Sequence, residues 1–259
     1  MKNSLYCFMT GEGPPVFLIH GLTNSGRSWK HQVSFLVRSG FRVFVPDLPG
    51  HGVSPKALEP ISVDFIAKQV LQVANEHNVD SFYICGISLG GMVALNMAIL
   101  EPDRIKKVVV SNTFSSFVNR ESHKMLTSWK SQFCKPGGTL ARLNESWPYL
   151  LKGSFRKSPE GLATYQSWHA LASETDGRSL VNVVDGMIGF DIENKLNSIL
   201  SPVTFVLGEA DCISDLETNN RIASKLGGEV FIDTIRFSRH LTNVDSPQAF
   251  NDCLLNALR

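Results

Sequence analysis

Short apolar runs alternate along the chain with longer segments in which apolar residues recur at helical spacing. Such short runs predict strands buried on both faces of a parallel sheet, and the helical spacing predicts amphipathic helices between them. The predicted strands cover residues 5–10, 16–19, 41–45, 81–85, 105–111, 202–208 and 229–235. The clearest predicted helices cover residues 62–77, the segment between Ser88 and Pro102, residues 214–225 and the segment from Pro247. This order predicts right-handed crossovers and a mainly parallel sheet.

The alternation stops after Thr113 and resumes at Pro202. Between these points the chain shows helical patches and turn signals, the latter at residues 136–138 and 158–159, but no convincing strand. We therefore predict an α/β core interrupted by an inserted helical cap. The predicted core consists of residues 1–113 and 201–259, and the predicted cap of residues 114–200.

Between a predicted buried strand and a predicted buried helix lies the motif Gly86-Ile87-Ser88-Leu89-Gly90. This G-x-S-x-G pattern is typical of the nucleophile elbow, a strained turn that exposes a serine hydroxyl above the end of a sheet. A Cβ at either glycine would collide with the neighbouring strand or helix. The helix that follows points its free N–H groups and its positive dipole end at the serine. Ser88 is therefore the candidate nucleophile, and a mere tight turn is the alternative.

A serine hydroxyl is a weak nucleophile at neutral pH and needs a base, which in turn needs an orienting group. In the topology typical of this elbow, an acid and then a histidine follow the serine along the chain. Asp211 lies just beyond the strand predicted at 202–208, at the carboxyl end where ligand chemistry collects in parallel sheets. It is the candidate acid, with Glu209 and Asp215 as rivals and a surface-loop role as the alternative for each. The other position used for the acid in this topology reads Ser-Asn-Thr at residues 111–113 and offers no carboxylate.

His240 follows the last predicted strand and is the only histidine after Asp211, so it is the candidate base by elimination. A lone histidine in a loop is usually a surface residue. His240, however, comes last in the order Ser88, Asp211, His240, and this order favours a catalytic role over a surface role.

A substrate oxygen that becomes negatively charged needs preorganised N–H donors. The backbone N–H of Leu89, directly after the candidate nucleophile, is one candidate donor for such an oxyanion hole. The backbone N–H of Leu22, in the loop after the strand 16–19, is the other. The alternative is that both are ordinary loop leucines. His20 is predicted to support its loop and His51 to pack beneath the site, so neither is a candidate base.

The 259 residues fit one large α/β domain, and 43% hydrophobic and 19% charged residues are ordinary for a globular protein. A formal net charge of +1 predicts no general attraction to nucleic acid or to membranes. The first residues lack the apolar run of a signal peptide, and no later segment is long enough to span a bilayer. The five scattered cysteines form no C-x-x-C pair and favour reduced thiols over a disulfide framework or a zinc site. Together these features predict a cytoplasmic protein.

Taken together, the motifs resemble the α/β-hydrolase superfamily, particularly its small capped serine hydrolases such as esterases and 3-oxoadipate enol-lactonases. Besides the elbow, the matching residues are His20, Gly21 and Trp29; Asp47, Gly50, Gly52 and Ser54; Gly208 and Asp211; and Pro247, Phe250 and Asn251. The resemblance implies an α/β-hydrolase fold, a catalytic triad of Ser88, Asp211 and His240, and hydrolysis without a cofactor or a metal. An aspartate nucleophile marks dehalogenases and epoxide hydrolases in this superfamily, so Ser88 argues against both.

The early part of the predicted cap combines aromatic residues with an excess of positive charge. Residues 114–160 hold eight Lys or Arg and three Glu, a balance of +5. One interpretation is an apolar pocket with a cationic rim, for which Phe114 and Trp129 are the candidate lining residues. The other is a solvated helical face over a packed core. Arg239, where the superfamily commonly has glycine before the histidine, adds a cation beside the candidate base. These cations predict a preference for acyl substrates with a negative charge away from the scissile bond.

The leading hypothesis is a serine hydrolase that cleaves a small ester, lactone or thioester, with a small-molecule acyl substrate and neither nucleic acid nor membrane as its partner. Two alternatives remain open. One is a small-molecule receptor or signalling protein that keeps the hydrolase fold with little or no turnover. The other is a C–C bond hydrolase that uses the same triad on a diketone.

Overall fold

A seven-stranded sheet forms the centre of the computed structural model, which describes residues 4–259. The strands are β1 (Cys7–Thr10), β2 (Pro15–Ile19), β3 (Arg42–Pro46), β4 (Phe82–Ile87), β5 (Ile105–Ser111), β6 (Val203–Gly208) and β7 (Val230–Ile235). They lie in the order β1-β3-β2-β4-β5-β6-β7. β1 is antiparallel to β3 and the other pairings are parallel, which confirms the predicted mainly parallel sheet. The predicted core begins with residues 1–3, which lie outside the described residues.

Side chains of the central strands alternate between two apolar cores, one on each face of the sheet. In β2, Phe17 and Ile19 enter one core and Val16 and Leu18 enter the other, and all four are fully buried. Full burial of an apolar side chain of this size contributes roughly 1.5–3 kcal/mol to folding. Because both faces of these strands are covered, the strands read in the sequence as continuous apolar runs.

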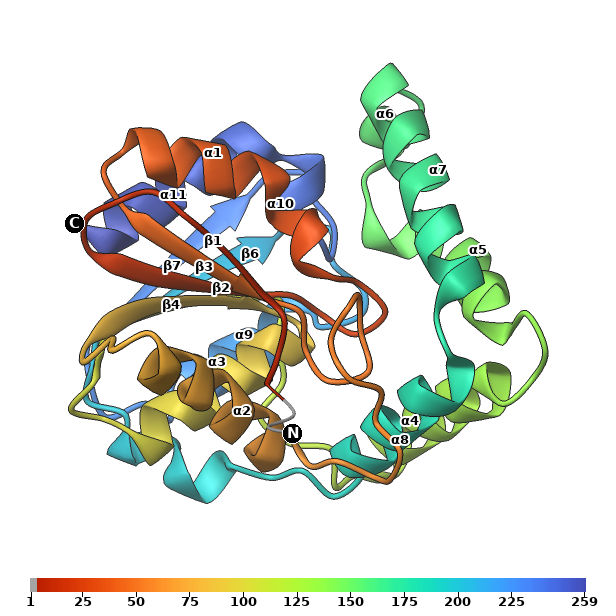
Figure 1. The fold of residues 1–259 in the computed structure, drawn as a ribbon, viewed down its shortest axis with the longest axis horizontal. Coiled ribbons are helices and arrows are strands. Elements are labelled where there is room, and N and C mark those ends of the chain that lie inside the picture. The colour runs from red at the N-terminus through yellow and green to blue at the C-terminus, as the bar shows by residue number, and fades with distance from the viewer. Residues whose placement is uncertain (1–3) are drawn as a thin grey trace.

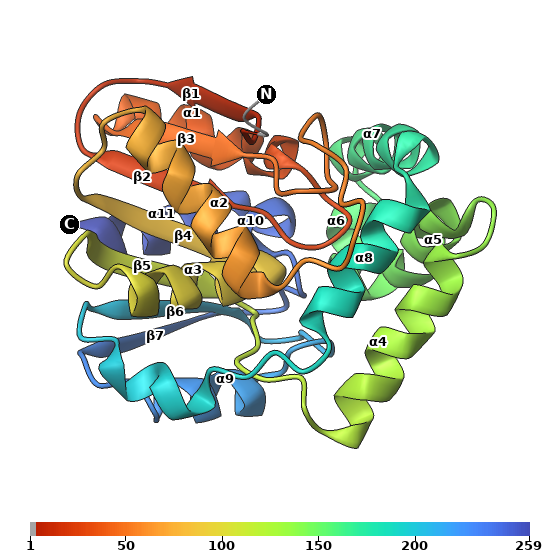
Figure 2. The same ribbon diagram turned by 60° about the horizontal axis from the view of Figure 1, so that its bottom comes forward.

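Helices cover both faces of the sheet (Figure 1 and Figure 2). α1 and α11 pack on one face, and α2, α3 and α9 pack on the other. The core helices are α1 (Lys30–Arg38), α2 (Val63–Glu76), α3 (Leu89–Leu100), α9 (Leu216–Ala223), α10 (Thr242–Asp245) and α11 (Pro247–Leu258), with 3₁₀ helices η1 (Gly26–Trp29) and η2 (Glu193–Ser198). The helix predicted at 62–77 is confirmed as α2, which begins after Ser62 caps it by accepting a hydrogen bond from the Phe65 N–H (3.1 Å). Within residues 4–259, no helix has both the length and the apolar character needed to cross a bilayer.

Five helices between β5 and β6 form the helical insert that the broken alternation predicts. They are α4 (Arg120–Phe133), α5 (Gly138–Leu150), α6 (Gly153–Arg156), α7 (Pro159–Glu174) and α8 (Gly177–Met187). Both turn signals fall at helix starts: residues 136–137 lie between α4 and α5, which begins at Gly138, and Ser158 caps α7, which begins at Pro159. The boundaries of the insert at residues 114 and 200 stay a prediction. In Figure 2 the insert lies beyond one end of the central strands, with α4 along its outer side.

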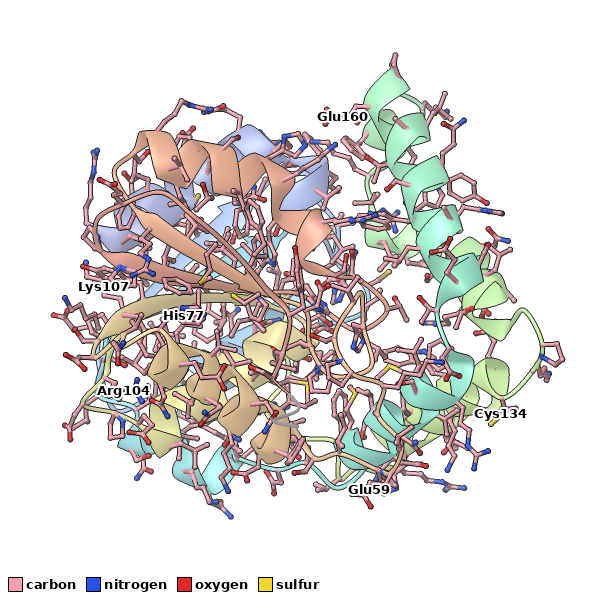
Figure 3. The ribbon with its side chains drawn as sticks, in the orientation of Figure 1. Glu59, His77, Arg104, Lys107, Cys134 and Glu160 are labelled. Atoms are coloured by element: carbon pink, nitrogen blue, oxygen red, sulfur yellow. The ribbon has the colours of Figure 1, made fainter. Side chains whose placement is uncertain are left out.

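Several ion pairs and hydrogen bonds fasten the insert, hereafter the cap, to the core. Glu160, labelled at one end of the cap in Figure 3, forms an ion pair with Lys30 of α1 at 3.4 Å. Both side chains are largely exposed, and such pairs contribute only about 0–1 kcal/mol. Another connection is a backbone hydrogen bond from the Leu241 N–H to the Leu150 carbonyl (3.0 Å), which joins the end of α5 to the loop after β7.

Candidate active site

Ser88 lies between β4 and α3, where the chain turns sharply at the carboxyl edge of the sheet. Its φ of 55° and ψ of −120° lie in a region that residues with a Cβ rarely adopt. Two glycines permit the turn: a Cβ on Gly86 would overlap the carbonyl oxygen of Gly90, and a Cβ on Gly90 would overlap that of Ile19. Because these overlaps involve backbone atoms, no side-chain rotation relieves them. The predicted steric reason for both glycines is therefore confirmed.

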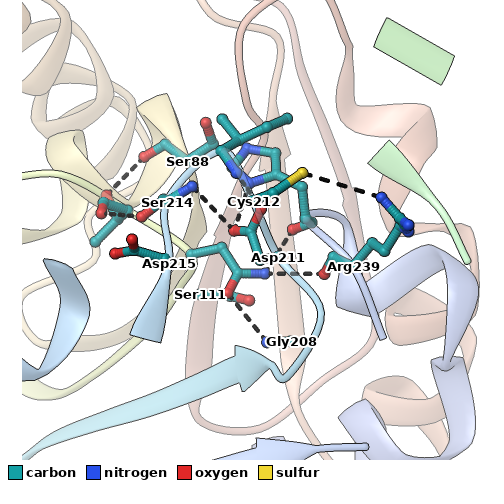
Figure 4. A network of polar contacts seen from close by, with 12 residues as sticks. Ser88, Ser111, Gly208, Asp211, Cys212, Ser214, Asp215 and Arg239 are labelled. Carbon is teal, nitrogen blue, oxygen red and sulfur yellow. Dashed lines mark hydrogen bonds and ion pairs between the residues drawn. The ribbon is translucent and has the colours of Figure 1, made fainter. Parts of the chain in front are cut away.

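Asp211 and His240 meet from two loops, one after β6 and one after β7. His240 Nδ1 donates a hydrogen bond to Asp211 Oδ2 at 2.9 Å (Figure 4). Asp211 Oδ1 accepts from the Ile213 N–H (2.8 Å), and Oδ2 also accepts from the Ser214 N–H (3.3 Å). Both side chains are buried, with 0% exposure for Asp211 and 4% for His240. Since a carboxylate only accepts, Nδ1 carries a proton, and in the neutral ring Nε2 is then the nitrogen with the free lone pair.

The end of β5 connects the Ser88 turn to the loops of the acid and the base. Thr113 Oγ1 donates to the Ser88 carbonyl at 2.8 Å. Asn112 Nδ2 donates to the His240 carbonyl (2.7 Å), and Asn112 Oδ1 accepts from the Gly208 N–H (3.1 Å). The sequence analysis assigns residues 111–113 no role beyond the lack of a carboxylate. The available signal was a run of three polar residues directly after a buried strand.

The two rival acids have other partners. Glu209 Oε2 accepts from the Phe237 N–H (3.0 Å), and Asp215 caps α9 by accepting from the Thr218 N–H (2.8 Å). The hydrogen bonds from Thr218 lower the pKa of Asp215, the backbone bond most strongly. Among the three carboxylates, the one hydrogen-bonded to His240 in residues 4–259 is that of Asp211.

Two backbone N–H groups near Ser88 have no hydrogen-bond acceptor in the part of the chain that the structure describes. They belong to Leu22, in the loop after β2, and to Leu89, the first residue of α3. The first N–H groups of a helix lack intrahelical acceptors and form the positive end of its dipole. Gly21 lets the Leu22 loop approach the turn closely, since a Cβ on Gly21 would lie 3.3 Å from the Ser88 Cβ. The structure thus leaves both candidate oxyanion-hole donors free beside Ser88.

Two buried histidines hold the Leu22 loop in place. His20 Nε2 accepts from the Leu48 N–H (3.0 Å), and His20 Nδ1 donates to the Gly21 carbonyl (2.8 Å). His51 Nε2 accepts from the Thr23 N–H (3.1 Å), while its Nδ1 donates to a carbonyl of its own loop (3.0 Å). An N–H only donates and a carbonyl only accepts, so both rings are neutral with the proton on Nδ1. These bonds confirm the predicted supporting role of His20.

Burial makes this neutral state persist in acid. It lowers the pKa of His20 from 6.5 to about 4, and together with the neighbouring His20 it lowers that of His51 from 6.5 to about 3. Between pH 6.5 and these values the unfolded chain binds protons that the folded chain does not. The free energy of unfolding therefore falls as the pH decreases below 6.5. At pH 5 the expected loss is about 2 kcal/mol for each histidine.

Urea unfolding at pH 7.5 and pH 5 measures this loss. In His51→Gln, which removes one of the two titrating groups, the difference in unfolding free energy between the two pH values should shrink by about 2 kcal/mol. His123→Gln, on the exposed surface of α4, is the matched control and should keep the wild-type difference. The explanation is refuted if His51→Gln loses as much stability in acid as the wild type does.

A cavity lies between the core and the cap. Its volume is about 70 Å³, measured as the space open to the centre of a water molecule. The core lines it with Ser88, His240 and the Leu22 loop, and the cap lines it mainly with apolar side chains. Phe114 and Trp129, the two candidate pocket residues, both lie in its wall. At about 10–15 Å³ for each water, the cavity holds about five waters, which suits a small ligand.

Arg239 does not line this cavity among the described residues. Its guanidinium is directed toward the Cys212 sulfur at 4.0 Å, as Figure 4 shows. Arg239 precedes the candidate base in the sequence, but its side chain extends along the loop that follows Asp211. Its cation therefore lies outside the cavity wall.

Known proteins share this architecture. The family model described as alpha/beta hydrolase fold matches residues 14–142. Bifunctional epoxide hydrolase 2 of Sus scrofa is 29% identical over 163 residues, which are 60% of this chain but 29% of that protein, so the chain spans less than a third of that relative. Pimeloyl-[acyl-carrier protein] methyl ester esterase of Nitrosospira multiformis is 28% identical over 228 residues, 83% of each chain. The crystal structure of the enol-lactonase from Burkholderia xenovorans LB400 has a TM-score of 0.90 at 20% identity, covering 98% of this chain and 96% of that one.

The chain is an α/β-hydrolase fold protein, with α4–α8 inserted between β5 and β6. The resemblance inferred from the sequence motifs and the fold class that it implies are both confirmed.

Proposed function

We propose that this protein is a serine hydrolase that cleaves small carboxylic esters, lactones or thioesters through an acyl-enzyme. The observation that supports this most directly is that Ser88 and His240 line one cavity, while the proton on His240 Nδ1 is held by the buried Asp211. The imidazole thereby presents a basic Nε2 on the side away from the acid. An esterase and an enol-lactonase among the similar proteins agree with this reaction class.

In the first half of the proposed reaction, Ser88 Oγ attacks the acyl carbon and His240 Nε2 takes the hydroxyl proton. The imidazolium that forms is stabilised by Asp211 at Nδ1. The acyl oxygen becomes negatively charged and accepts hydrogen bonds from the N–H groups of Leu22 and Leu89. When the tetrahedral intermediate collapses, the bond to the leaving oxygen or sulfur breaks and His240 gives its proton to that atom.

In the second half, a water molecule attacks the acyl-enzyme. His240 Nε2 takes a proton from the water, and the same two N–H groups again stabilise the oxyanion. Collapse of the second intermediate breaks the bond to Ser88 Oγ, which recovers its proton from His240, and the carboxylic acid leaves. Proton transfer of this kind accelerates a reaction by roughly 10²–10⁴-fold, and the remaining acceleration comes from positioning and the oxyanion hole.

A fluorophosphonate probe and a panel of short-chain esters and thioesters test the proposal together. The probe should form one phosphorus–oxygen bond with loss of fluoride, and peptide mass analysis should locate it on Ser88. Short-chain p-nitrophenyl esters should be hydrolysed and should slow the labelling by competition. Absence of labelling, together with tight binding of an unhydrolysed ligand, would overturn the proposal in favour of a receptor that keeps the hydrolase fold.

A further inference from the structure

The cap contributes many cations, but they differ sharply in where their side chains lie. Lys130 of α4 is bound to Asp185 of α8 at 2.6 Å, and Lys152 donates to the Ser246 hydroxyl at 2.8 Å. Neither lines the cavity. Among the described residues of the cavity wall, the one with a charged side chain is Arg142, and no carboxylate accompanies it there. Of the cap's cations, Arg142 is thus the one whose side chain lies in the described cavity wall.

Arg142 lies in the middle of the face that α5 presents to the cavity. The residues of α5 in the cavity wall are Thr139, Arg142, Leu143, Ser146 and Leu150. Their positions follow the pattern i, i+3, i+4, i+7 and i+11, which places them on one side of the helix. A cation at the centre of such a face is enclosed by the cap, and it contrasts with the apolar side chains that make up most of the wall.

The guanidinium of Arg142 is held in position but is poorly neutralised. It lies over the Trp129 ring, 4.7 Å from the centroid, which fixes its orientation. Its nearest carboxylate oxygen is Glu145 Oε1 at 4.0 Å, and the Glu145 side chain is 62% exposed against 17% for Arg142. Glu145 also accepts from Gln132 through its other oxygen at 2.7 Å. The 4.0 Å contact is too long for a hydrogen bond, and within residues 4–259 the guanidinium donates none to a side chain or a carbonyl, so its planar fork of donors is available to a ligand.

Burial further disfavours the poorly neutralised charge of Arg142. It lowers the pKa of Arg142, since a cation away from water is disfavoured, while Glu145 opposes the shift only weakly from its exposed position. A guanidinium remains charged at neutral pH in spite of such a shift. The cost of holding it there is offset when an anion enters the cavity and forms charge-assisted hydrogen bonds with it.

We propose that Arg142 is the specificity-determining residue of this cavity and binds a carboxylate at the far end of a short acyl substrate. The inference rests on the proposed serine hydrolase function, and it supplies the substrate class: half-esters, thioesters or lactones of small dicarboxylic acids. The planar guanidinium matches a carboxylate with two parallel hydrogen bonds. The cavity is small, with about 70 Å³ open to the centre of a water molecule, and we therefore expect a short acyl chain between the two carbonyl groups.

The test compares phenyl hydrogen glutarate with phenyl pentanoate, which differ by a carboxylate in place of the terminal methyl group. Rates are corrected for uncatalysed hydrolysis, because a neighbouring carboxylate can attack its own ester. The measured quantity is the ratio of kcat/KM for the anionic ester to that for the neutral ester. The variants are Arg142→Met, Arg142→Lys and, as a matched control on the exposed surface of the same cap, Arg120→Met.

The wild type should favour the anionic ester, and Arg142→Met should lower the ratio by about 10- to 100-fold, the usual range for hydrogen bonds to a charged group. The change should appear mainly in KM, since the remote carboxylate is bound equally in ground and transition states. Arg142→Lys should give an intermediate ratio, and Arg120→Met the wild-type ratio. An unchanged ratio in Arg142→Met, or a wild-type preference for the neutral ester, would overturn the proposal while leaving the serine hydrolase function intact.

A binding measurement separates this proposal from the proposed function. Calorimetry with glutarate uses the Ser88→Ala protein, which cannot turn over an ester, and the same protein with Arg142→Met added. Weaker glutarate binding in the double variant supports the role of Arg142 even if neither ester is hydrolysed by the wild type. Equal binding in the two proteins, or no binding to either, contradicts it.

Discussion

Ser88→Ala is expected to lower kcat for short-chain esters by about 10⁴- to 10⁶-fold, the largest effect of any single change in this chain. Alanine removes the atom that would bond to the acyl carbon, and no other hydroxyl is presented by the strained turn. The backbone should not change, because alanine has the same Cβ in the same φ, ψ region. Steady-state hydrolysis measures the loss, and thermal unfolding followed by circular dichroism checks that the fold is kept.

Ser128→Ala is the control for this change. Ser128 is an exposed residue of α4, and its replacement should leave both kcat and the unfolding temperature at the wild-type values. Turnover in Ser88→Ala within tenfold of the wild type would remove Ser88 from the reaction and with it the acyl-enzyme mechanism.

Asp211→Asn is expected to lower kcat by about 10³- to 10⁴-fold while keeping the fold. In the wild type, one carboxylate oxygen accepts from the Ile213 N–H at 2.8 Å and the other faces His240 Nδ1 at 2.9 Å. The asparagine carbonyl oxygen takes the place at Ile213, so its NH₂ group faces Nδ1. Two donors cannot share that contact, and the imidazole proton moves to Nε2. The nitrogen nearest the nucleophile is then protonated and cannot act as a base.

The rival acid provides the control. Asp215 follows Asp211 closely in the same loop, but it caps α9 through the Thr218 N–H. An asparagine there still accepts that bond, so Asp215→Asn should keep near wild-type kcat at a small cost in stability. The pH dependence of kcat/KM in both variants completes the test. A loss in Asp215→Asn as large as that in Asp211→Asn would reverse the assignment of the acid.

Most of the fold could be predicted because its sheet is buried on both faces. The strands then appear as apolar runs, such as the one predicted at 16–19 and observed as Pro15–Ile19. Short helices and edge strands are harder to predict from the sequence. The one-turn helix Thr242–Asp245 lacks a periodic pattern, and it was not predicted. The edge strand Cys7–Thr10 is shorter than the predicted 5–10, since an edge strand pairs on one side only.

Residues of the site could be predicted where a local rule applies to them. Ser88 is marked by its flanking glycines, and His240 by its position in the chain. Asn112 could not be found in this way, because its two hydrogen bonds join segments that are far apart in sequence. The same is true of the cap: composition showed the excess of cations, but whether Arg142 or Arg239 faces the cavity depends on helix rotation and loop direction. These follow from tertiary packing and have no sequence pattern of their own.

The inward face of α5 has an evolutionary consequence. The five side chains in the cavity wall, from Thr139 to Leu150, belong to the cap, whereas Ser88 and His240 belong to the core. Mutations along that single helical face can therefore enlarge, neutralise or recharge the chamber without disturbing the strained turn or the imidazole. Homologous proteins can therefore differ in substrate range through changes in this one helix. The candidate reacting groups, Ser88 and His240, can stay the same while the cap changes.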